Sequence, residues 1–198
     1  MIITVAGFKG GVGKTTTAIH VAAYLQELAP TVLVDGDPNR SGLTWARHNR
    51  LPFAVVDERA AARAARSYEH IVIDTAARPE EEDLKALAEG CDLLIIPSKP
   101  DTLSLDALRL TINTLRAIQA SNYRVLLTIV PPKPSRDGED AHAALVAAGY
   151  PTFATMIRRY KAFEDAASEG VTVAGLHSQR NAQEGWADYV AVGKEIVS

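Results

Sequence analysis

Apolar residues follow two alternating patterns along this chain. Uninterrupted apolar runs predict buried strands at residues 2–6, 31–35, 70–74, 93–97 and 124–130, with two shorter ones at 51–56 and 152–156. Between these runs, apolar residues recur every three or four positions and predict helices at 18–28, 42–49, 58–67, 79–89, 101–120, 141–148, 161–168 and 182–197. Strands that are apolar throughout and alternate with helices predict an α/β fold, in which a mostly parallel sheet is covered by helices on both faces.

Composition limits the class of protein that this chain can be but does not indicate a function. The 198 residues are most simply one domain, spanning 1–198, with ordinary hydrophobic (47%) and charged (23%) contents. The net charge of −3 gives no global basic field, although a local basic patch remains possible. The single Cys91 excludes an internal disulfide. Since no apolar stretch is long enough to span a membrane and the chain begins directly with a strand, we expect a cytoplasmic protein without a membrane partner.

A glycine-rich segment lies between the first predicted strand and the first predicted helix. Strand, glycine-rich turn and a helix that starts with Gly-Lys-Thr together form a phosphate cradle, in which backbone N–H groups and the helix dipole face the anion. Lys14 is expected to reach the β- and γ-phosphates, and the Thr15 hydroxyl is expected to bind Mg²⁺. The predicted nucleotide-binding residues of the segment are Gly10, Gly11, Val12, Gly13, Lys14, Thr15 and Thr16.

Three aspartates follow predicted strands at the edge of the sheet where ligands of parallel sheets bind. Asp74 ends an apolar run and is placed like a carboxylate that holds Mg²⁺. Asp35 and Asp37 form an Asp-x-Asp-Pro turn after the second run, and their spacing puts both carboxylates on one side of an extended backbone. One of these two can support the metal shell, and the other can orient the water that attacks the phosphate.

The strict P-loop pattern is not met, because its first glycine would fall on Phe8. Instead the segment reads Lys-Gly-Gly-x-Gly-Lys-Thr, with Lys9 as an additional early lysine, and this resembles the deviant Walker A box of the ParA/MinD family of dimeric ATPases. The resemblance implies binding of ATP with Mg²⁺, an ATP-induced homodimer, and a Lys9 that acts across the dimer interface on nucleotide held by the other subunit.

The same resemblance extends to the aspartates and covers nearly the whole chain. It implies that Asp37 positions the attacking water and that Asp35 and Asp74 belong to the metal shell. Asn39 stands where the family often has Gln, a departure that we expect hydrolysis to tolerate. Arg78 follows Asp74 where the family has a switch segment, and its contact with phosphate, a partner subunit or solvent is left open.

By position in the family, the segment from Met156 to Arg159 flanks the adenine base, with Met156 and Arg158 as the expected contacts. Basic residues near those with which family members contact DNA are Arg158, Arg159, Lys161, Arg180 and Lys194. Acidic residues are interspersed among them, so a solvated surface is an equal alternative for this set. Three further arginines at helical spacing, Arg59, Arg63 and Arg66, favour a solvated helix face over a binding stripe.

Several functions are compatible with these features. The main expectation is a nucleoid-associated ATPase that binds non-specific DNA in its ATP state, segregates or positions plasmid or chromosomal DNA, and is stimulated by a ParB-like partner. One alternative is the same ATPase positioning a protein cargo, such as a carboxysome or chemoreceptor cluster, through an adaptor protein. Another is a P-loop biosynthetic ligase resembling dethiobiotin synthetase, although such an enzyme has no use for Lys9. The C-terminal segment has few cations and little bulky apolar surface, which argues against a MinD-like membrane helix.

Overall fold

The strands of the computed structural model, which describes residues 1–7, 9–77, 81–177 and 179–198, form one all-parallel sheet. Its strand order is β3-β2-β4-β1-β5-β6. The strands are β1 (Ile2–Gly7), β2 (Thr31–Gly36), β3 (Ala54–Asp57), β4 (His70–Ala77), β5 (Leu93–Ser98) and β6 (Tyr123–Leu127). This confirms the predicted single α/β domain with a parallel sheet, because every apolar run that became a strand is paired on both sides except at the two edges.

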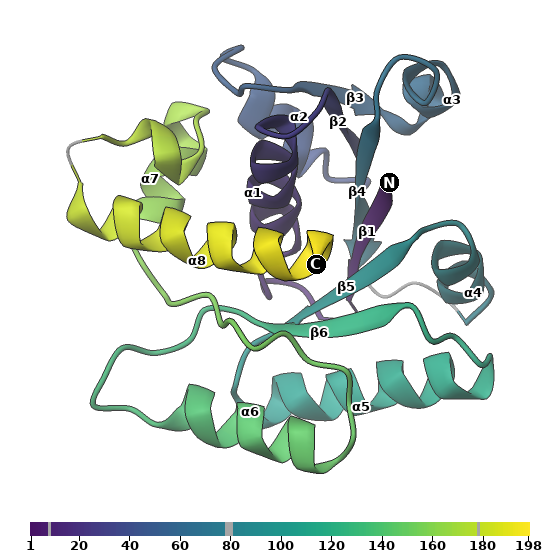
Figure 1. Ribbon diagram of the computed structural model, residues 1–198, viewed down its shortest axis with the longest axis vertical. Helices are drawn as coiled ribbons and strands as arrows, with labels where there is room; N and C mark the ends of the chain where they lie inside the picture. The colour runs from purple at the N-terminus through teal and green to yellow at the C-terminus, as the bar shows by residue number, and fades with distance from the viewer. Residues whose placement is uncertain (8, 78–80, 178) are drawn as a thin grey trace.

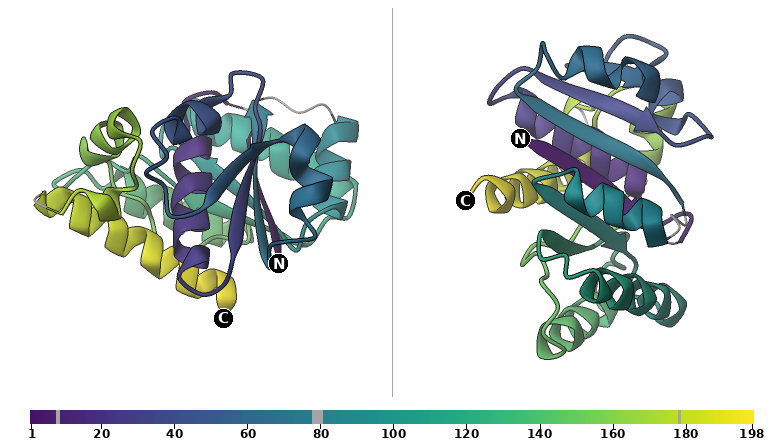
Figure 2. Two further views of the ribbon diagram at one scale, coloured as in Figure 1. Left: turned by 90° about the horizontal axis from the view of Figure 1, so that it is seen from above. Right: turned by 90° about the vertical axis from the view of Figure 1, so that its right-hand side faces the viewer.

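Helices cover the sheet on both faces (Figures 1 and 2). They are α1 (Lys14–Gln26), α2 (Ser41–Ala46), α3 (Ala61–Ala64), α4 (Glu81–Glu89), α5 (Thr102–Ala117), α6 (Asp137–Ala147), α7 (Ala162–Glu169) and α8 (Arg180–Val197), with 3₁₀ turns η1 (Glu58–Ala60) and η2 (Val173–Gly175). One core lies between the sheet and α1, α2, α7 and α8, and it includes Ile3, Val5 and Leu126. The other lies under α4, α5 and α6 and includes Ala6, Ile96 and Leu127. Alternate residues of a strand thus enter opposite cores.

Three predicted elements differ from the structure. Residues 152–156 are predicted as a strand, but the only bridge of this described segment joins Thr152 to Val125, and a second isolated bridge, Arg158 with Val130, lies just beyond it. The segment touches the edge of β6 at separate points instead of running beside it. The strand predicted at 124–130 ends at Leu127, since Ile129 has a φ of 55° that is incompatible with extended backbone. The helix predicted at 58–67 is divided into η1 and the short α3.

The carboxyl ends of β1, β2 and β4 bring three segments together at one edge of the sheet. Asp35 of β2 is in register with Asp74 of β4, and Val5 of β1 is in register with the same Asp74. The loop before α1 begins where β1 ends, so the glycine-rich segment and both strand-end aspartates share this edge. The fold therefore brings to one edge of the sheet the three stretches in which the sequence predicts site residues.

Candidate nucleotide-binding site

The glycine-rich segment wraps into the start of α1. Gly11 and Gly13 have φ values of 71° and 82°, a left-handed conformation that residues with a side chain rarely adopt. Gly13 is the N-cap residue of α1, and its carbonyl accepts the Thr17 N–H at 2.8 Å. Thr128, just beyond β6, donates its hydroxyl to the Val12 carbonyl at 2.7 Å and fixes the loop against the sheet. The segment ends at a helix start, whose first backbone N–H groups have no partner within the helix, and such a start is a typical anion site.

Asp74 lies beside the first turn of α1 and is completely buried. Its Oδ2 accepts the Thr15 hydroxyl at 2.6 Å, whereas its Oδ1 is buried with no partner among the described residues. Burial raises the pKa of Asp74 to about 6, and Asp35 and Asp37 also raise it, against lowering contributions from Thr15 and Lys14. An unpartnered carboxylate oxygen next to a threonine hydroxyl fits the shell of a hydrated Mg²⁺, which prefers oxygen ligands and keeps several waters.

The two carboxylates of the Asp-x-Asp-Pro turn have different surroundings. Both oxygens of the buried Asp35 accept backbone N–H groups, from Asp37 at 3.1 Å and from Leu43 at 2.8 Å, so this side chain ties the turn to α2. Asp37 accepts both the N–H and the amide of Asn39 on one oxygen, at 2.9 and 3.0 Å. Among the described residues no group donates to its second oxygen, which leaves that oxygen available to a water, as the expected role requires. The metal role predicted for Asp35 competes with its two backbone bonds.

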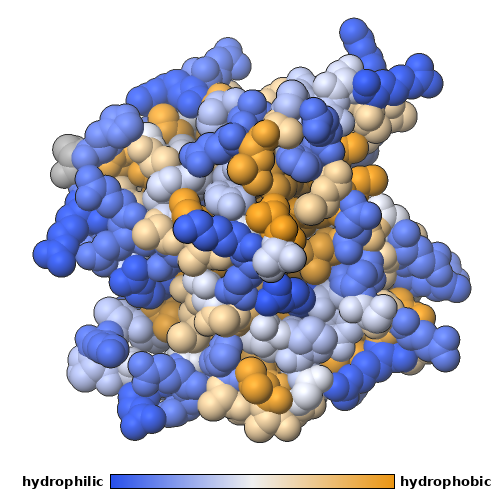
Figure 3. Space-filling view, in the orientation of Figure 1, coloured by the Kyte–Doolittle hydropathy of each residue, from blue (hydrophilic) through white to orange (hydrophobic). Residues whose placement is uncertain are grey.

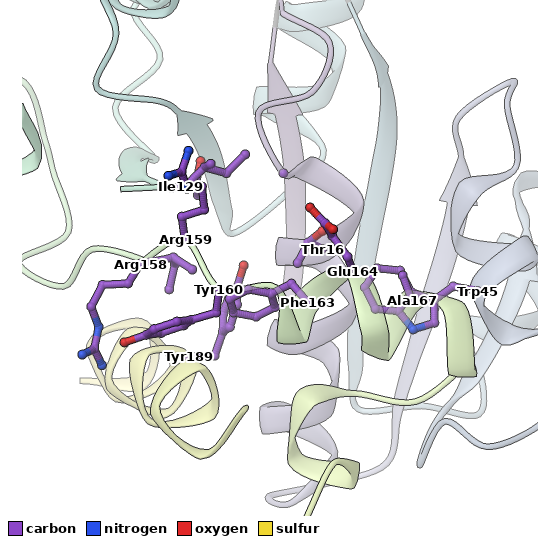
Figure 4. A pocket seen from close by; sticks show the side chains of 13 residues that line it. Thr16, Trp45, Ile129, Arg158, Arg159, Tyr160, Phe163, Glu164, Ala167 and Tyr189 are labelled. Carbon is purple, nitrogen blue, oxygen red and sulfur yellow. The ribbon is translucent and has the colours of Figure 1, made fainter. Parts of the chain in front are cut away.

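Two adjoining cavities lie in front of the cradle. The larger, about 700 Å³, is lined by the glycine-rich segment together with Asp37 and Asn39. The smaller, about 280 Å³, is mainly apolar and is lined by Tyr160, Phe163 and Tyr189 among others (Figure 4). Trp45 and Ile129 line both. A chamber that offers Lys14, Thr15 and Asp37 to phosphates and metal, and that continues into an aromatic one for a flat base, is the division that a nucleoside triphosphate requires.

Lys9 is bound within its own chain. Its Nζ lies 3.0 Å from the Ser104 hydroxyl and 3.4 Å from a carboxylate oxygen of Asp101, at the start of α5. Asp101 caps that helix. Burial raises the pKa of Asp101, but hydrogen bonds from Ser104 and Lys9 outweigh this effect and lower the pKa to about 2. Lys99 also lies 3.6 Å from the same carboxylate. Any action of Lys9 on a second subunit thus requires its ammonium group to leave α5.

Arg40, next in the turn after Asn39, has a left-handed φ of 52° and extends toward η1. One guanidinium nitrogen donates to the Asp35 carbonyl at 2.9 Å, and the guanidinium forms a bidentate ion pair with the Glu58 carboxylate. The hydrogen bonds from Arg40 lower the pKa of Glu58 to about 2. The backbone N–H of Arg40 donates to the Asp37 carbonyl at 2.9 Å and closes the turn. The turn that carries Asp37 is therefore fastened directly to η1.

The residues predicted to flank the base are separated by the structure. Met156 packs under the sheet, against the core of α4, α5 and α6, and does not line either cavity. Arg158 does line the smaller cavity, but its guanidinium extends away from it (Figure 4) and pairs with Asp188 at 2.7 Å and Glu184 at 3.4 Å. Arg159 lies beside Ile129 in the same view. Base contacts from Met156 and Arg158 side chains stay predictions that this arrangement does not favour.

The basic residues predicted to contact DNA do not form one open surface. Lys161 pairs with Asp165, and Arg180 pairs at 3.1 Å with the same Glu184 that Arg158 contacts. Arg159 and Lys194 are exposed and have no carboxylate partner among the residues described. Arg180 and Lys194 stand fourteen positions apart on α8, about 21 Å along the helix. The switch residue Arg78 lies outside the described residues, as does Phe8 of the glycine-rich segment.

Sequence reasoning missed the aromatic cluster that anchors α1. The ring of His20 stacks on Tyr189 with centroids 4.8 Å apart and meets Trp45 and Phe163 edge-on. Trp45 donates to the Val171 carbonyl at 2.8 Å. These residues come from α1, α2, α7 and α8, and no local pattern announces that they meet. The only sequence signal was a histidine and aromatic residues on the apolar faces of the predicted helices.

Within the described part of the chain, no helix is long and apolar enough to cross a bilayer. Nor does that part contain a group of three or more His, Cys, Asp and Glu side chains arranged to hold a metal ion. A divalent cation in the larger cavity would thus rely on Thr15, Asp74, water and the phosphates of a ligand, as Mg²⁺ commonly does.

Comparisons with known proteins agree with this geometry. A family model for the CobQ/CobB/MinD/ParA nucleotide binding domain matches residues 3–173. Maintenance of carboxysome distribution protein A from Gloeobacter kilaueensis is 35% identical over 202 residues, which cover 98% of this chain and 93% of that protein. Protein ParA from Rhizobium radiobacter is 27% identical over 146 residues, covering 66% and 65%. The structure of Cyanthece apo McdA superposes with a TM-score of 0.75 at 17% identity, over 100% of this chain and 99% of that one.

Proposed function

Because the chain belongs to the CobQ/CobB/MinD/ParA nucleotide-binding family, we propose that it is an Mg²⁺-dependent ATPase that positions a large protein body inside the cell. In the proposed cycle, ATP joins two copies of the chain, the dimer binds DNA without sequence preference on the nucleoid, and an adaptor on the cargo stimulates hydrolysis. The observation that carries the proposal is the 35% identity with a carboxysome distribution protein across 98% of this chain.

The geometry supports the chemical part of this cycle. The N–H groups of Gly11 and Gly13 and the ammonium of Lys14 would hold the phosphates in the larger cavity. Mg²⁺, held through Thr15, Asp74 and water, would neutralise charge on the β- and γ-phosphates when bound. Asp37, whose second oxygen is free of protein donors among the described residues, would orient the attacking water.

The role of Lys9 in this scheme follows from its present contacts. Its ammonium binds Asp101 and Ser104 of its own chain, both at the start of α5, and its side chain is 31% exposed. A triphosphate on a second copy would compete for this cation with a single partly exposed carboxylate and a hydroxyl. Phosphate oxygens carry more charge than these partners, so we propose that ATP on the facing subunit draws Lys9 across the interface.

Segregation of plasmid or chromosomal DNA is a second candidate. It is favoured by the likeness to ParA of Rhizobium radiobacter. It is also favoured by a likeness to the chromosome-partitioning ATPase Soj of Thermus thermophilus, which is 32% identical over 137 residues; these cover 67% of this chain and 47% of that protein. Both likenesses extend over less of the chain than the one to the carboxysome distribution protein. The comparisons therefore support a protein cargo more strongly than the DNA cargo that the sequence led us to expect first.

The proposal is tested with purified wild type and the variant Asp37→Ala. We expect wild type to hydrolyse ATP slowly, and the variant to accumulate as an ATP-bound dimer that hydrolyses at least about 100-fold more slowly, because the water is no longer oriented. Sedimentation with ATP, ADP and no nucleotide reports the dimer, and phosphate release reports turnover. A variant that hydrolyses ATP like wild type would remove Asp37 from the mechanism.

The cargo is tested in the source cell by deleting the gene and imaging both candidate cargoes. Loss of even spacing of a protein body, with plasmid and chromosome inheritance unchanged, is the result expected for cargo positioning. Plasmid loss with undisturbed protein bodies would instead establish the second candidate. Asp37→Ala in place of the deletion should give the same defect, since a dimer that cannot hydrolyse ATP cannot release its track.

A further inference from the structure

The outward face of η1 and α3 carries three arginines separated only by small residues. Arg59, Arg63 and Arg66 are all exposed, and between them Ala62 and Ala65 are exposed as well. Backbone hydrogen bonds from Arg66 to Arg63 and from Ser67 to Ala64 continue the helical turns beyond α3. Spacings of four and three residues therefore put the arginines on one side of the segment. Figure 3 shows a strongly hydrophilic surface over this part of the molecule, at the upper right.

None of these three guanidinium groups has a carboxylate within ion-pair distance in the described part of the chain. The acidic residues at the start of the segment bind other groups, because Asp57 accepts the Ala60 N–H at 3.1 Å and Glu58 pairs with Arg40. The cations at the C-terminal end of the chain are mostly neutralised in comparison. Arg158, Lys161 and Arg180 all face carboxylates of α7 or α8.

The arginine face is also joined to the nucleotide cavity. Glu58 directly precedes Arg59, and its partner Arg40 closes the turn that carries Asp37. A change of that turn on binding a γ-phosphate would therefore be passed to η1 through one ion pair. Since β3 is an edge strand of the sheet, nothing from the sheet lies beyond this segment. The face is open, positively charged and connected to the part of the site that senses nucleotide.

We propose that Arg59, Arg63 and Arg66 form the surface with which this protein contacts the phosphate backbone of DNA, an inference that rests on the proposed ATP-dependent DNA binding. The three residues span about 10 Å of helical rise, which matches about three phosphates of one strand at 3.4 Å per nucleotide. Contacts of guanidinium groups with phosphate carry no sequence information, so this surface would bind duplexes of any sequence.

The test measures how DNA affinity depends on salt. Fluorescence anisotropy with a random 40-base-pair duplex is recorded for the full chain with ATP or ADP over a series of KCl concentrations. The test variant is R59Q/R63Q/R66Q. The matched control K161Q/R180Q/K194Q also removes three positive charges, but one from the N-cap of α7 and two from α8. A charge-retaining variant, R59K/R63K/R66K, checks that loss of binding does not come from misfolding. ATP binding of every variant is measured in parallel.

If the proposal is right, the slope of log affinity against log salt becomes shallower by about 2.7 in R59Q/R63Q/R66Q for each chain that touches the duplex. The lysine variant keeps the wild-type slope, and the matched control changes it by less than about 1. A slope lost in the control but kept in R59Q/R63Q/R66Q would place DNA on the C-terminal helices and overturn the inference alone. A wild type that binds ATP but no DNA would overturn both the inference and the DNA step of the proposed function. If wild type binds anionic vesicles in preference to DNA, and R59Q/R63Q/R66Q loses this binding, then the ligand of this surface is a membrane and the inference is overturned.

Discussion

His20 makes the stability of this protein sensitive to acid in a way that can be worked out from its contacts. The ring is fully buried, its Nδ1 lies 2.7 Å from the Thr16 carbonyl, and its Nε2 accepts the Val173 N–H at 3.1 Å. These partners require the neutral tautomer with its proton on Nδ1, because a protonated Nε2 would face an N–H donor. Burial lowers the pKa of His20 from 6.5 to about 4, more than the hydrogen bond to Thr16 raises it.

The sign and size of the effect follow from proton linkage. Between pH 6.5 and 4 the unfolded chain binds a proton at His20 that the folded chain does not bind, so the free energy of unfolding falls as the pH falls. With these two pKa values, His20 alone removes about 2 kcal/mol between pH 7 and pH 5 and about 3 kcal/mol by pH 4. That is a large fraction of the stability of an ordinary domain.

Urea denaturation of wild type and His20→Gln at pH 7, 6 and 5 isolates this contribution. Asp74, whose raised pKa acts in the opposite direction, and His70, whose pKa is lowered by burial, are present in both proteins and cancel in the difference. The glutamine variant should be less stable at pH 7, since one buried partner loses its hydrogen bond. Its stability should nevertheless fall by about 2 kcal/mol less than that of wild type from pH 7 to 5. Equal losses in the two proteins would refute the neutral, buried state of His20.

Two further changes test the contacts of Lys9 and the packing of α8. Asp101→Asn removes the carboxylate that holds the Lys9 ammonium, and because this pair is half-exposed, the free energy of unfolding should change by less than about 1 kcal/mol. The ATP concentration needed for dimerisation, measured by sedimentation, should fall. An unchanged ATP requirement would show that this contact does not restrain Lys9. Gly193→Ala would put a Cβ atom 2.2 Å from the Tyr24 ring between α8 and α1, so urea denaturation should report a loss of about 1–3 kcal/mol, and wild-type stability would contradict the packing described for these helices.

The strands were the most predictable part of the fold, for a physical reason. A strand in the middle of a parallel sheet is buried on both faces, so β1, β4 and β5 appear as continuous apolar runs that no surface element imitates. Residues 152–156 misled because they too are partly apolar, with Phe153 fully buried. Phe153 enters the core from a connecting segment, and the sequence pattern cannot distinguish that from a side chain on a strand.

The candidate site was predictable where its chemistry depends on residues close together in the chain. The glycine-rich segment lies before a helix as expected, and the structure brings Asp37 and Asp74 to the same edge of the sheet. What spacing could not reveal is which carboxylate is already engaged by the backbone. Asp35 accepts two N–H groups and anchors α2, while Asp74 keeps an unpartnered oxygen beside Thr15. Two aspartates with similar sequence settings thus differ in the donors that reach them from elsewhere.

The limits of the sequence are clearest for the basic residues, because the effect of a charge depends on its neighbours in space. Arg158 and Arg180 lie 22 positions apart in the chain, yet both pair with Glu184, so their charges are balanced within the protein. Arg63 lies in a stretch that favours an ordinary solvated helix face, and it gains interest only because the nearby acids turn toward Arg40 and a helix cap. The same ion pair that frees the arginine face also fixes the Asp37 turn. One contact between distant segments therefore decides both where positive charge is available and what that charge is connected to.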